Sequence, residues 1–118
     1  MAVTTGKKSV TQVDFMAHDT SAVNAAVDDV FGGSATLHTI VINNGGTKAY
    51  VKFYDAADPS VGTTEPSIIL VADASKVTVW NIIEGIAFTN VSYNANNAAG
   101  KTSGDNPGGT LALSMVVR

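Results

Sequence analysis

The chain has 118 residues, a formal net charge of −3 and no cysteine. Its length fits a single domain, and the lack of cysteine excludes disulfides and thiolate metal sites. Seven Lys and Arg residues against ten Asp and Glu residues provide no basic footprint for nucleic acid. No apolar run approaches the ~20 residues that span a bilayer, and the N-terminus does not read as a signal peptide. We therefore expect a protein that is made in a cytoplasm, stays soluble and binds neither nucleic acid nor membrane.

The choice of residues favours β-structure. Val, Thr, Ala, Asn and Gly are frequent, whereas Leu and Glu are rare. Branching at Cβ suits Val, Ile and Thr to a pleated sheet, and Asn and Gly supply turns. Charged residues make up only 14% of the chain, against about 25% in typical soluble domains. This low charge content predicts a surface that is largely covered by partners.

The chain begins with a segment that nothing anchors to a core. Residues 1–9 are therefore predicted to form a flexible arm, and residues 10–118 a single β-sandwich domain. A first strand is expected at 10–15. The next segment, 21–31, is compatible with a short helix because its apolar residues have helical spacing, but a strand from about Val27 is favoured.

The strongest pattern predicts a β-hairpin. Two strand-like runs, 36–42 and 48–54, flank Asn43-Asn44-Gly45-Gly46, whose residue types tolerate positive φ. In the second run, alternation places Ala49, Val51 and Phe53 on one face and Tyr50, Lys52 and Tyr54 on the other.

Further strands are expected at 67–71, 76–80, 86–93 and 110–117, with loops at 55–66 and 94–109. Seven or eight strands without a long helix predict an all-β fold, a two-sheet antiparallel β-sandwich that is jelly-roll-like. Period-two spacing predicts a core of Leu37 or Ile40 with Ile42, Val51, Phe53, Ile69, Val77, Val79, Phe88, Leu111 and Leu113.

Residues 95–102 fit a relaxed phosphate-binding loop that ends in Gly100-Lys101-Thr102. Such a loop must lead into a helix whose amides hold the phosphates, and residues 103–109 cannot continue a helix. We therefore expect a polar loop that does not bind ATP. His18 and His38 lie on different elements without a nucleophile or carboxylate at motif spacing, which favours packed or surface roles over catalysis.

Two binding alternatives stay open. Asp55, Asp58 and Glu65 could offer oxygens to calcium, although turn formation is the simpler interpretation for the aspartates. Asp28 and Asp29 would project to opposite faces of a strand and so not form one site. Sugar stacking could use Tyr50, Lys52 and Tyr54 with Trp80. The glycosylation pattern at Asn90 carries no weight without a secretion signal.

The stretches 37–44, 49–55 and 59–66 resemble a group of short phage and prophage proteins. The likeness lies in a strand that ends in Asn, the strand Tyr-Val-Lys-Phe-Tyr-Asp and the loop Pro-Ser-Val-Gly-Thr-Thr-Glu-Pro. It continues through Gly-Ile-Ala-Phe at 85–88 and covers roughly residues 35–93.

The resemblance implies a non-enzymatic structural protein of a phage particle, made in the host cytoplasm and located in the virion. The favoured role is a capsid decoration (cement) protein that binds the major capsid protein or other virion proteins as a homo-oligomer, by analogy a trimer. The alternatives are a tail or fibre accessory protein and a carbohydrate-binding β-sandwich module. No catalytic, cofactor-binding or metal-binding residues, and no cofactor, are expected.

Overall fold

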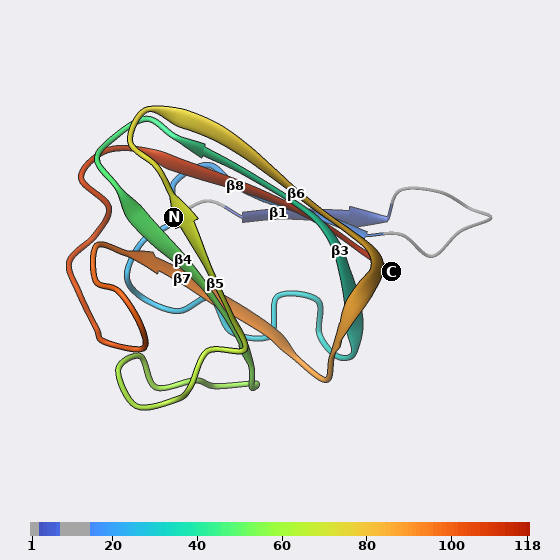
Figure 1. Ribbon diagram of the computed structural model, residues 1–118. Helices are drawn as coiled ribbons and strands as arrows, with labels where there is room; N and C mark the ends of the chain where they lie inside the picture. The colour runs from blue at the N-terminus through green and yellow to red at the C-terminus, as the bar shows by residue number, and fades with distance from the viewer. Residues whose placement is uncertain (1–2, 8–14) are drawn as a thin grey trace.

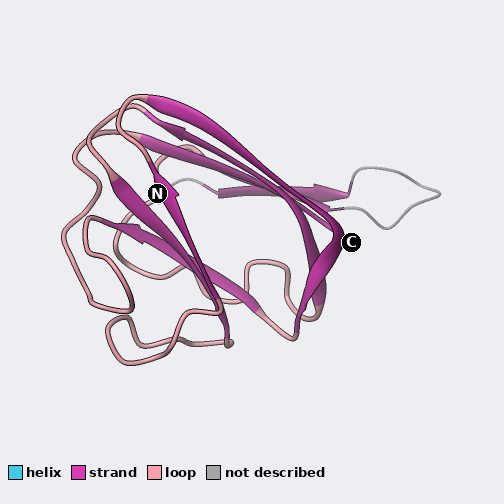
Figure 2. Cartoon of the chain, in the orientation of Figure 1, coloured by secondary structure: helices cyan, strands magenta, loops and turns pink. Residues whose placement is uncertain are grey.

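The computed structural model describes residues 3–7 and 15–118. These residues form eight strands and no helix (Figure 2). The strands make two antiparallel sheets that pack face to face (Figure 1), which confirms the predicted β-sandwich. In this part of the chain no helix is present that could cross a membrane.

The larger sheet has five strands in the order β1-β2-β8-β3-β6. Their bounds are Val3–Lys7 (β1), Phe15–Asp19 (β2), Leu111–Val117 (β8), Ala35–Asn44 (β3) and Lys76–Phe88 (β6). The smaller sheet has three strands in the order β5-β4-β7, with bounds Ile68–Ala72 (β5), Ala49–Asp55 (β4) and Val91–Asn96 (β7).

The chain from β2 onward forms nested antiparallel pairs. The innermost pair is β4 with β5, the next is β3 with β6, and the outermost is β2 with β8. Residues 21–31 and β7 form a further level of the nesting, between the β3–β6 pair and the β2–β8 pair, and they run beside each other. Such a long hairpin, rolled up so that its pairs alternate between two sheets, is a jelly roll.

The hairpin predicted for 36–54 is wrong. β3 and β4 do not pair, because they are successive segments of the same arm of the long hairpin and lie in different sheets. At the corner between them, Asn44 Nδ2 donates to the carbonyl oxygens of Thr47 (2.9 Å) and Ala72 (3.0 Å). Alternation shows which face of each strand is buried. That face is the same whether the two strands pair as a hairpin or lie in different sheets on either side of a corner, so alternation cannot distinguish the two arrangements.

The glycines at this corner serve close packing rather than positive φ. Neither Gly45 nor Gly46 has positive φ. A Cβ on Gly46 would lie 2.7 Å from the Gly108 carbonyl oxygen, and one on Gly109 would lie 2.6 Å from Gly46 Cα. The backbones of two loops therefore cross here at a distance that only glycine permits.

Two strand boundaries differ from expectation. The predicted strands 76–80 and 86–93 are redistributed, since β6 continues to Phe88 and the chain then turns at Thr89-Asn90 into the other sheet. The carboxylate of Asp55 accepts the amides of both turn residues, at 2.8 and 3.0 Å. Of the strand expected at 10–15, only Phe15 is described, where β2 begins.

The predicted arm, residues 1–9, is described only at Val3–Lys7. There it forms β1, the edge strand of the larger sheet, which pairs with β2 from Val3 opposite Asp19 to Lys7 opposite Phe15. Residues 1–2 and 8–14 lie outside the described residues.

The segment 21–31 contains neither the favoured strand from Val27 nor the alternative helix. Val27 makes one isolated bridge with Tyr93, in which each amide donates to the other carbonyl at 2.8 and 3.1 Å. Asp29 then has φ of +42°, which interrupts an extended chain. The segment nevertheless covers β7, because the Val30 amide donates to the Val91 carbonyl oxygen and the Ala95 amide donates to the Val23 carbonyl oxygen.

The core confirms most of the predicted residues and corrects three. The buried ones include Leu37, Ile40, Ile42, Val51, Phe53, Phe88, Leu111 and Leu113. Ile69 is exposed because β5 turns Leu70 and Ala72 inward, so the prediction was one residue out of register. Val77 and Val79 are exposed because they point to the outer side of the edge strand β6.

Candidate functional site

The aromatic face predicted on β4 is buried. Lys52 and Tyr54 are fully covered by loops. Lys52 Nζ donates to the Thr102 carbonyl oxygen at 2.8 Å, and Tyr54 Oη donates to Asn94 Oδ1 at 3.1 Å. Burial lowers the pKa of the Lys52 ammonium and raises the pKa of the Tyr54 hydroxyl. These two side chains are therefore structural and cannot stack on a sugar.

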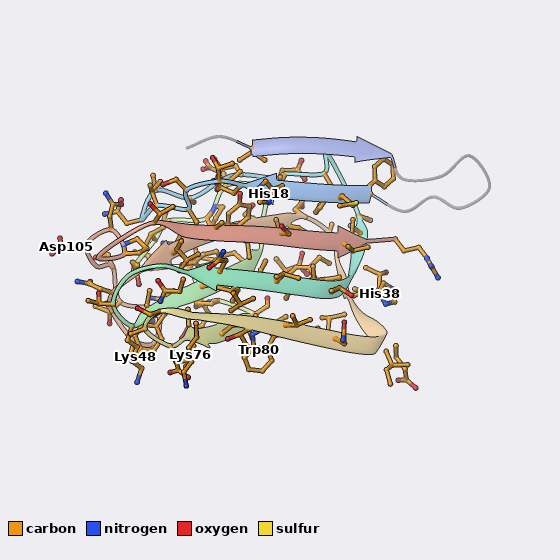
Figure 3. All side chains as sticks on the ribbon, turned by 90° about the horizontal axis from the view of Figure 1, so that it is seen from above. His18, His38, Lys48, Lys76, Trp80 and Asp105 are labelled. Atoms are coloured by element: carbon orange, nitrogen blue, oxygen red, sulfur yellow. The ribbon has the colours of Figure 1, made fainter. Side chains whose placement is uncertain are left out.

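The remaining aromatic candidates do not form a platform. Tyr50 is partly exposed on the smaller sheet, with the Lys48 ammonium 5.8 Å from its ring centroid. Trp80 lies on β6 of the larger sheet, along its free edge (Figure 3). Of the four residues considered for sugar binding, two are thus buried and Trp80 lies on the other sheet.

The segment resembling a phosphate-binding loop does not have the required geometry. Its first residues belong to β7, which ends at Asn96, and no helix follows Lys101. Lys101 Nζ instead lies 3.7 Å from Glu65 Oε1, with both side chains largely exposed. The expectation for 94–109 as a free loop also needs correction, because Asn94, Asn96 and Pro107 are buried in the fold.

The two histidines lie on different strands. His18 Nδ1 is 2.7 Å from Ser114 Oγ on the exposed outer face of the larger sheet, a contact that sequence spacing could not reveal. His38 Nδ1 lies 3.2 Å from the Ile82 carbonyl oxygen. The adjacent carboxylate, that of Asp19, is buried and accepts from Tyr93 Oη and the Ser21 amide, so it does not orient the His18 ring as a triad requires.

The three residues considered for calcium do not converge. The Asp55 carboxylate binds the amides of the turn after β6, Glu65 lies beside Lys101, and Asp58 interacts with Asp28. Among the described residues there is no group of three or more side chains that could hold a metal ion.

Asp28 and Asp58 form a carboxyl pair between two loops. Asp28 is exposed, and partial desolvation, then the negative charge of Asp58 and a hydrogen bond with it, raise the pKa of its carboxyl. Asp29 has different partners, since its Oδ1 accepts from the Gly33 amide (3.0 Å) and from Asn90 Nδ2 (3.2 Å). The residues pair with distant loops rather than with each other.

One shallow depression of about 330 Å³ lies between the ends of β3 and β6. Its lining is made by Ser34, Ala35, Thr36, Ala87, Phe88, Thr89 and Arg118. The polar side-chain groups in this lining are hydroxyls and one guanidinium, which do not provide a pair for general acid–base catalysis.

The outer face of the larger sheet is a more distinctive surface. Residues opposite one another on paired strands share a face, so the registers place one set of side chains together there. The set consists of Met16, His18, Thr39, Val41, Asn43, Val77, Val79, Asn81, Ala112, Ser114 and Val116. None carries a carboxylate, ammonium or guanidinium group. Figure 3 looks onto this face, which we call the uncharged face.

Exposed apolar residues also gather on one flank. In the described chain every exposed large apolar side chain except Val3 and Met16 lies on β5 or β6. These two strands are the unpaired edges of their sheets and contact each other. We call them together the open flank, and we call β7 with residues 21–31 the covered flank.

The chain matches no known family model, and no curated protein or solved structure is similar to it at a significant level.

Proposed function

We propose that the protein is a non-enzymatic structural component of a phage particle, most specifically a capsid decoration protein. The observation that carries this proposal is the uncharged face. Most protein surfaces mix charged residues of both signs, whereas extended uncharged surfaces with exposed apolar side chains are typical of sites that bind other proteins. The resemblance of residues 35–93 to phage proteins gives the class of partner.

The fold is compatible with this role without deciding it. Jelly rolls build viral capsid domains and also lectins, so the function has to be argued from surfaces rather than from topology. The burial of Lys52 and Tyr54 argues against the carbohydrate-binding alternative, because it leaves Tyr50 as the one accessible aromatic side chain on that face of β4. A tail or fibre accessory protein would use the same kind of surface and remains the second candidate.

The proposed partners are the major capsid protein and further copies of this chain. Capsids offer three-fold positions, so a trimer is the favoured assembly. Its contact segments would be residues 1–9 and 94–109, the latter through exposed residues such as Ala99 to Ser103. Several individually weak contacts on one particle then give retention through multivalency.

Mass spectrometry of purified phage particles tests the proposal. We expect the chain in intact particles at a fixed ratio to the major capsid protein. A variant lacking residues 1–9 is expected to fold and yet to be depleted from particles. Absence of the protein from purified particles, or turnover of a substrate by the isolated protein, would refute the proposal.

A further inference from the structure

β6 differs from an ordinary edge strand. Edge strands are usually short or protected by charges and prolines, since their free amides and carbonyls can pair with another chain. β6 has 13 residues and contains no proline, and its only charged residues are Lys76 and Glu84. Between them lies an uninterrupted uncharged run of seven residues, Val-Thr-Val-Trp-Asn-Ile-Ile.

The strand is also unusually apolar on its exposed parts. Ile83 has 94% of its surface exposed, Val77 has 62% and Trp80 has 37%. Burial of apolar surface contributes about 25 cal/mol per Å², so leaving these side chains in water forgoes a substantial free energy. A partner strand would cover them.

β6 is regular in its first part and bulged relative to β3 in its last part. From Lys76 to Asn81 it pairs residue by residue with β3. Residues 82–85 then form a bulge opposite His38, and Gly85 adopts φ of +75° there. The bulge contains Ile83 and Glu84, which are both exposed.

From these observations we propose that β6 pairs antiparallel with β6 of a second copy of this chain, about a two-fold axis beside Trp80. In that register Lys76 lies opposite Glu84 of the second copy, at both ends of the pairing. Val77, likewise, lies opposite Ile83 of the second copy. Opposite charges face each other and the two most exposed apolar side chains face each other, which no other antiparallel register of this strand achieves together.

The order of residues along β6 also favours a second copy of this chain over an unrelated partner strand. One uncharged run with a cation at one end and an anion at the other is complementary to itself when reversed, as an isologous two-fold contact requires. The pairing joins two five-stranded sheets over residues 76–84 of each strand. Residues 79–81 of the two copies pair as regular strands, and residues 76–78 of each copy lie against the bulged residues 82–84 of the other.

This contact is separate from the proposed trimer. The described part of the arm is β1, and β1 and β6 are opposite edges of the larger sheet. The inference therefore does not depend on the virion role, and it is tested with the isolated full-length protein.

Charge reversal tests the pairing. The molar mass of the wild type, measured by light scattering after size exclusion at about 100 µM, is expected to equal two chains, or six where trimers form as well. Lys76→Glu and Glu84→Lys each place like charges opposite one another and are expected to halve that mass. The double variant Lys76→Glu/Glu84→Lys restores opposite charges and is expected to restore the wild-type mass.

Asp105→Lys is the matched control for Glu84→Lys, because it changes the net charge equally at an exposed position away from β6 (Figure 3). It is expected to leave the mass unchanged. Both Lys76 and Glu84 are exposed, so circular dichroism should confirm intact folding of all variants. A monomeric wild type, single reversals without effect, or a double variant that fails to reassociate would each overturn the proposal.

Crosslinking tests the register independently. The chain has no cysteine, so Trp80→Cys introduces one thiol per copy. Directly opposed residues have Cα atoms about 4.5–5.5 Å apart, within disulfide range, and oxidation should yield a covalent dimer. In Thr78→Cys, on the same face, the thiols would be about 14 Å apart and should not crosslink. Equal crosslinking of the two variants would exclude this register.

Discussion

The two flanks of the sandwich differ in how their edge strands are covered. On the covered flank, the irregular segment 21–31 satisfies the free edge of β7 with backbone hydrogen bonds between Val27 and Tyr93. On the open flank, β5 and β6 end their sheets with apolar side chains exposed. The chain thus closes the β7 edge of the smaller sheet with its own residues and leaves the neighbouring edges at β5 and β6 accessible to a partner.

The covered flank also contains a fully buried polar contact. Tyr93 Oη donates to Asp19 Oδ2 at 2.8 Å, and the other carboxylate oxygen of Asp19 accepts the Ser21 amide at 3.0 Å. Burial, followed by this hydrogen bond and the negative charge, raises the pKa of Tyr93. A buried carboxylate is stable only while such partners remain, and this contact joins β2 of the larger sheet to β7 of the smaller sheet.

The largest expected effect distinguishes the two flanks by stability. Tyr93→Ala removes a fully buried ring and leaves Asp19 without its partner, so we expect the free energy of unfolding to fall by at least about 3–5 kcal/mol. Trp80→Ala removes a partly exposed ring and should cost only about 1–2 kcal/mol in the monomer. Urea unfolding measures both, and equal losses would contradict the distinction.

The second prediction concerns Gly85, a position on the open flank where an added side chain should destabilise the fold. Gly85 has φ of +75°, and an added Cβ would lie 2.4 Å from Thr36 Cγ2 and 2.8 Å from His38 Cε1. Gly85→Ala should therefore cost about 2–4 kcal/mol, from backbone strain and overpacking together.

Gly100→Ala is its matched control. Gly100 has a similar φ of +63° with open space around it, so only the backbone cost of about 1–2 kcal/mol applies. Thermal unfolding of the two variants separates the effects, and a Gly100 variant as unstable as the Gly85 variant would show that side-chain crowding is unimportant.

The sequence predicted the strands much better than their partners. β-branched alternation identified the segments that became β3, β4, β5 and β8, because burial of one face is a local property of a strand. It could not assign strands to sheets, since the pairing of β3 with β6 and of β4 with β7 depends on residues far apart in the chain. The false hairpin at Asn43–Gly46 arose from this limit.

The surface was less predictable for the same reason. Alternation placed Lys52 and Tyr54 on an outward face correctly, but a loop near Thr102, some 50 residues later, covers that face. The Asp28–Asp58 pair likewise joins two loops whose proximity no spacing rule indicates. The uncharged face required the cross-strand register of β2, β8, β3 and β6, which only the structure provides.

The third prediction uses the buried ammonium of Lys52 beneath that loop. Burial lowers its pKa in the folded state, whereas the unfolded chain keeps the ordinary value of about 10.4. Between these two values the unfolded state binds more protons, so the free energy of unfolding rises with pH. Below the lowered pKa the folded protein bears the cost of burying a charge.

The variant Lys52→Met has no ionisable group at this position, so its free energy of unfolding lacks this dependence on pH. We expect the stability of the Met variant relative to the wild type to decrease as pH rises from 7 to 10, measured by urea unfolding at each pH. Tyr54 and Tyr93, whose pKa values are raised, affect both proteins alike and cancel in the comparison. A difference that stays constant over this range would mean that Lys52 keeps its proton throughout.

The smallest expected effect lies within the segment that covers β7. Asp28 belongs to that segment and meets Asp58 of the loop after β4, and the pKa of Asp28 is raised first by partial desolvation and then by Asp58. Asp58→Asn removes the neighbouring charge and leaves the partial desolvation of Asp28, so the pKa of Asp28 should fall toward its ordinary value without reaching it. NMR titration of the Asp28 carboxyl carbon measures this, with Asp105→Asn as the exposed control. Because a raised carboxyl pKa contributes stability only at low pH, and this is lost as pH rises through the folded pKa, Asp58→Asn should make the covered flank slightly more stable at pH 7 relative to pH 3. An unchanged Asp28 titration would show that the two loops are not held together in solution, and the contrast between a covered and an open flank would then rest on the backbone bonds to β7 alone.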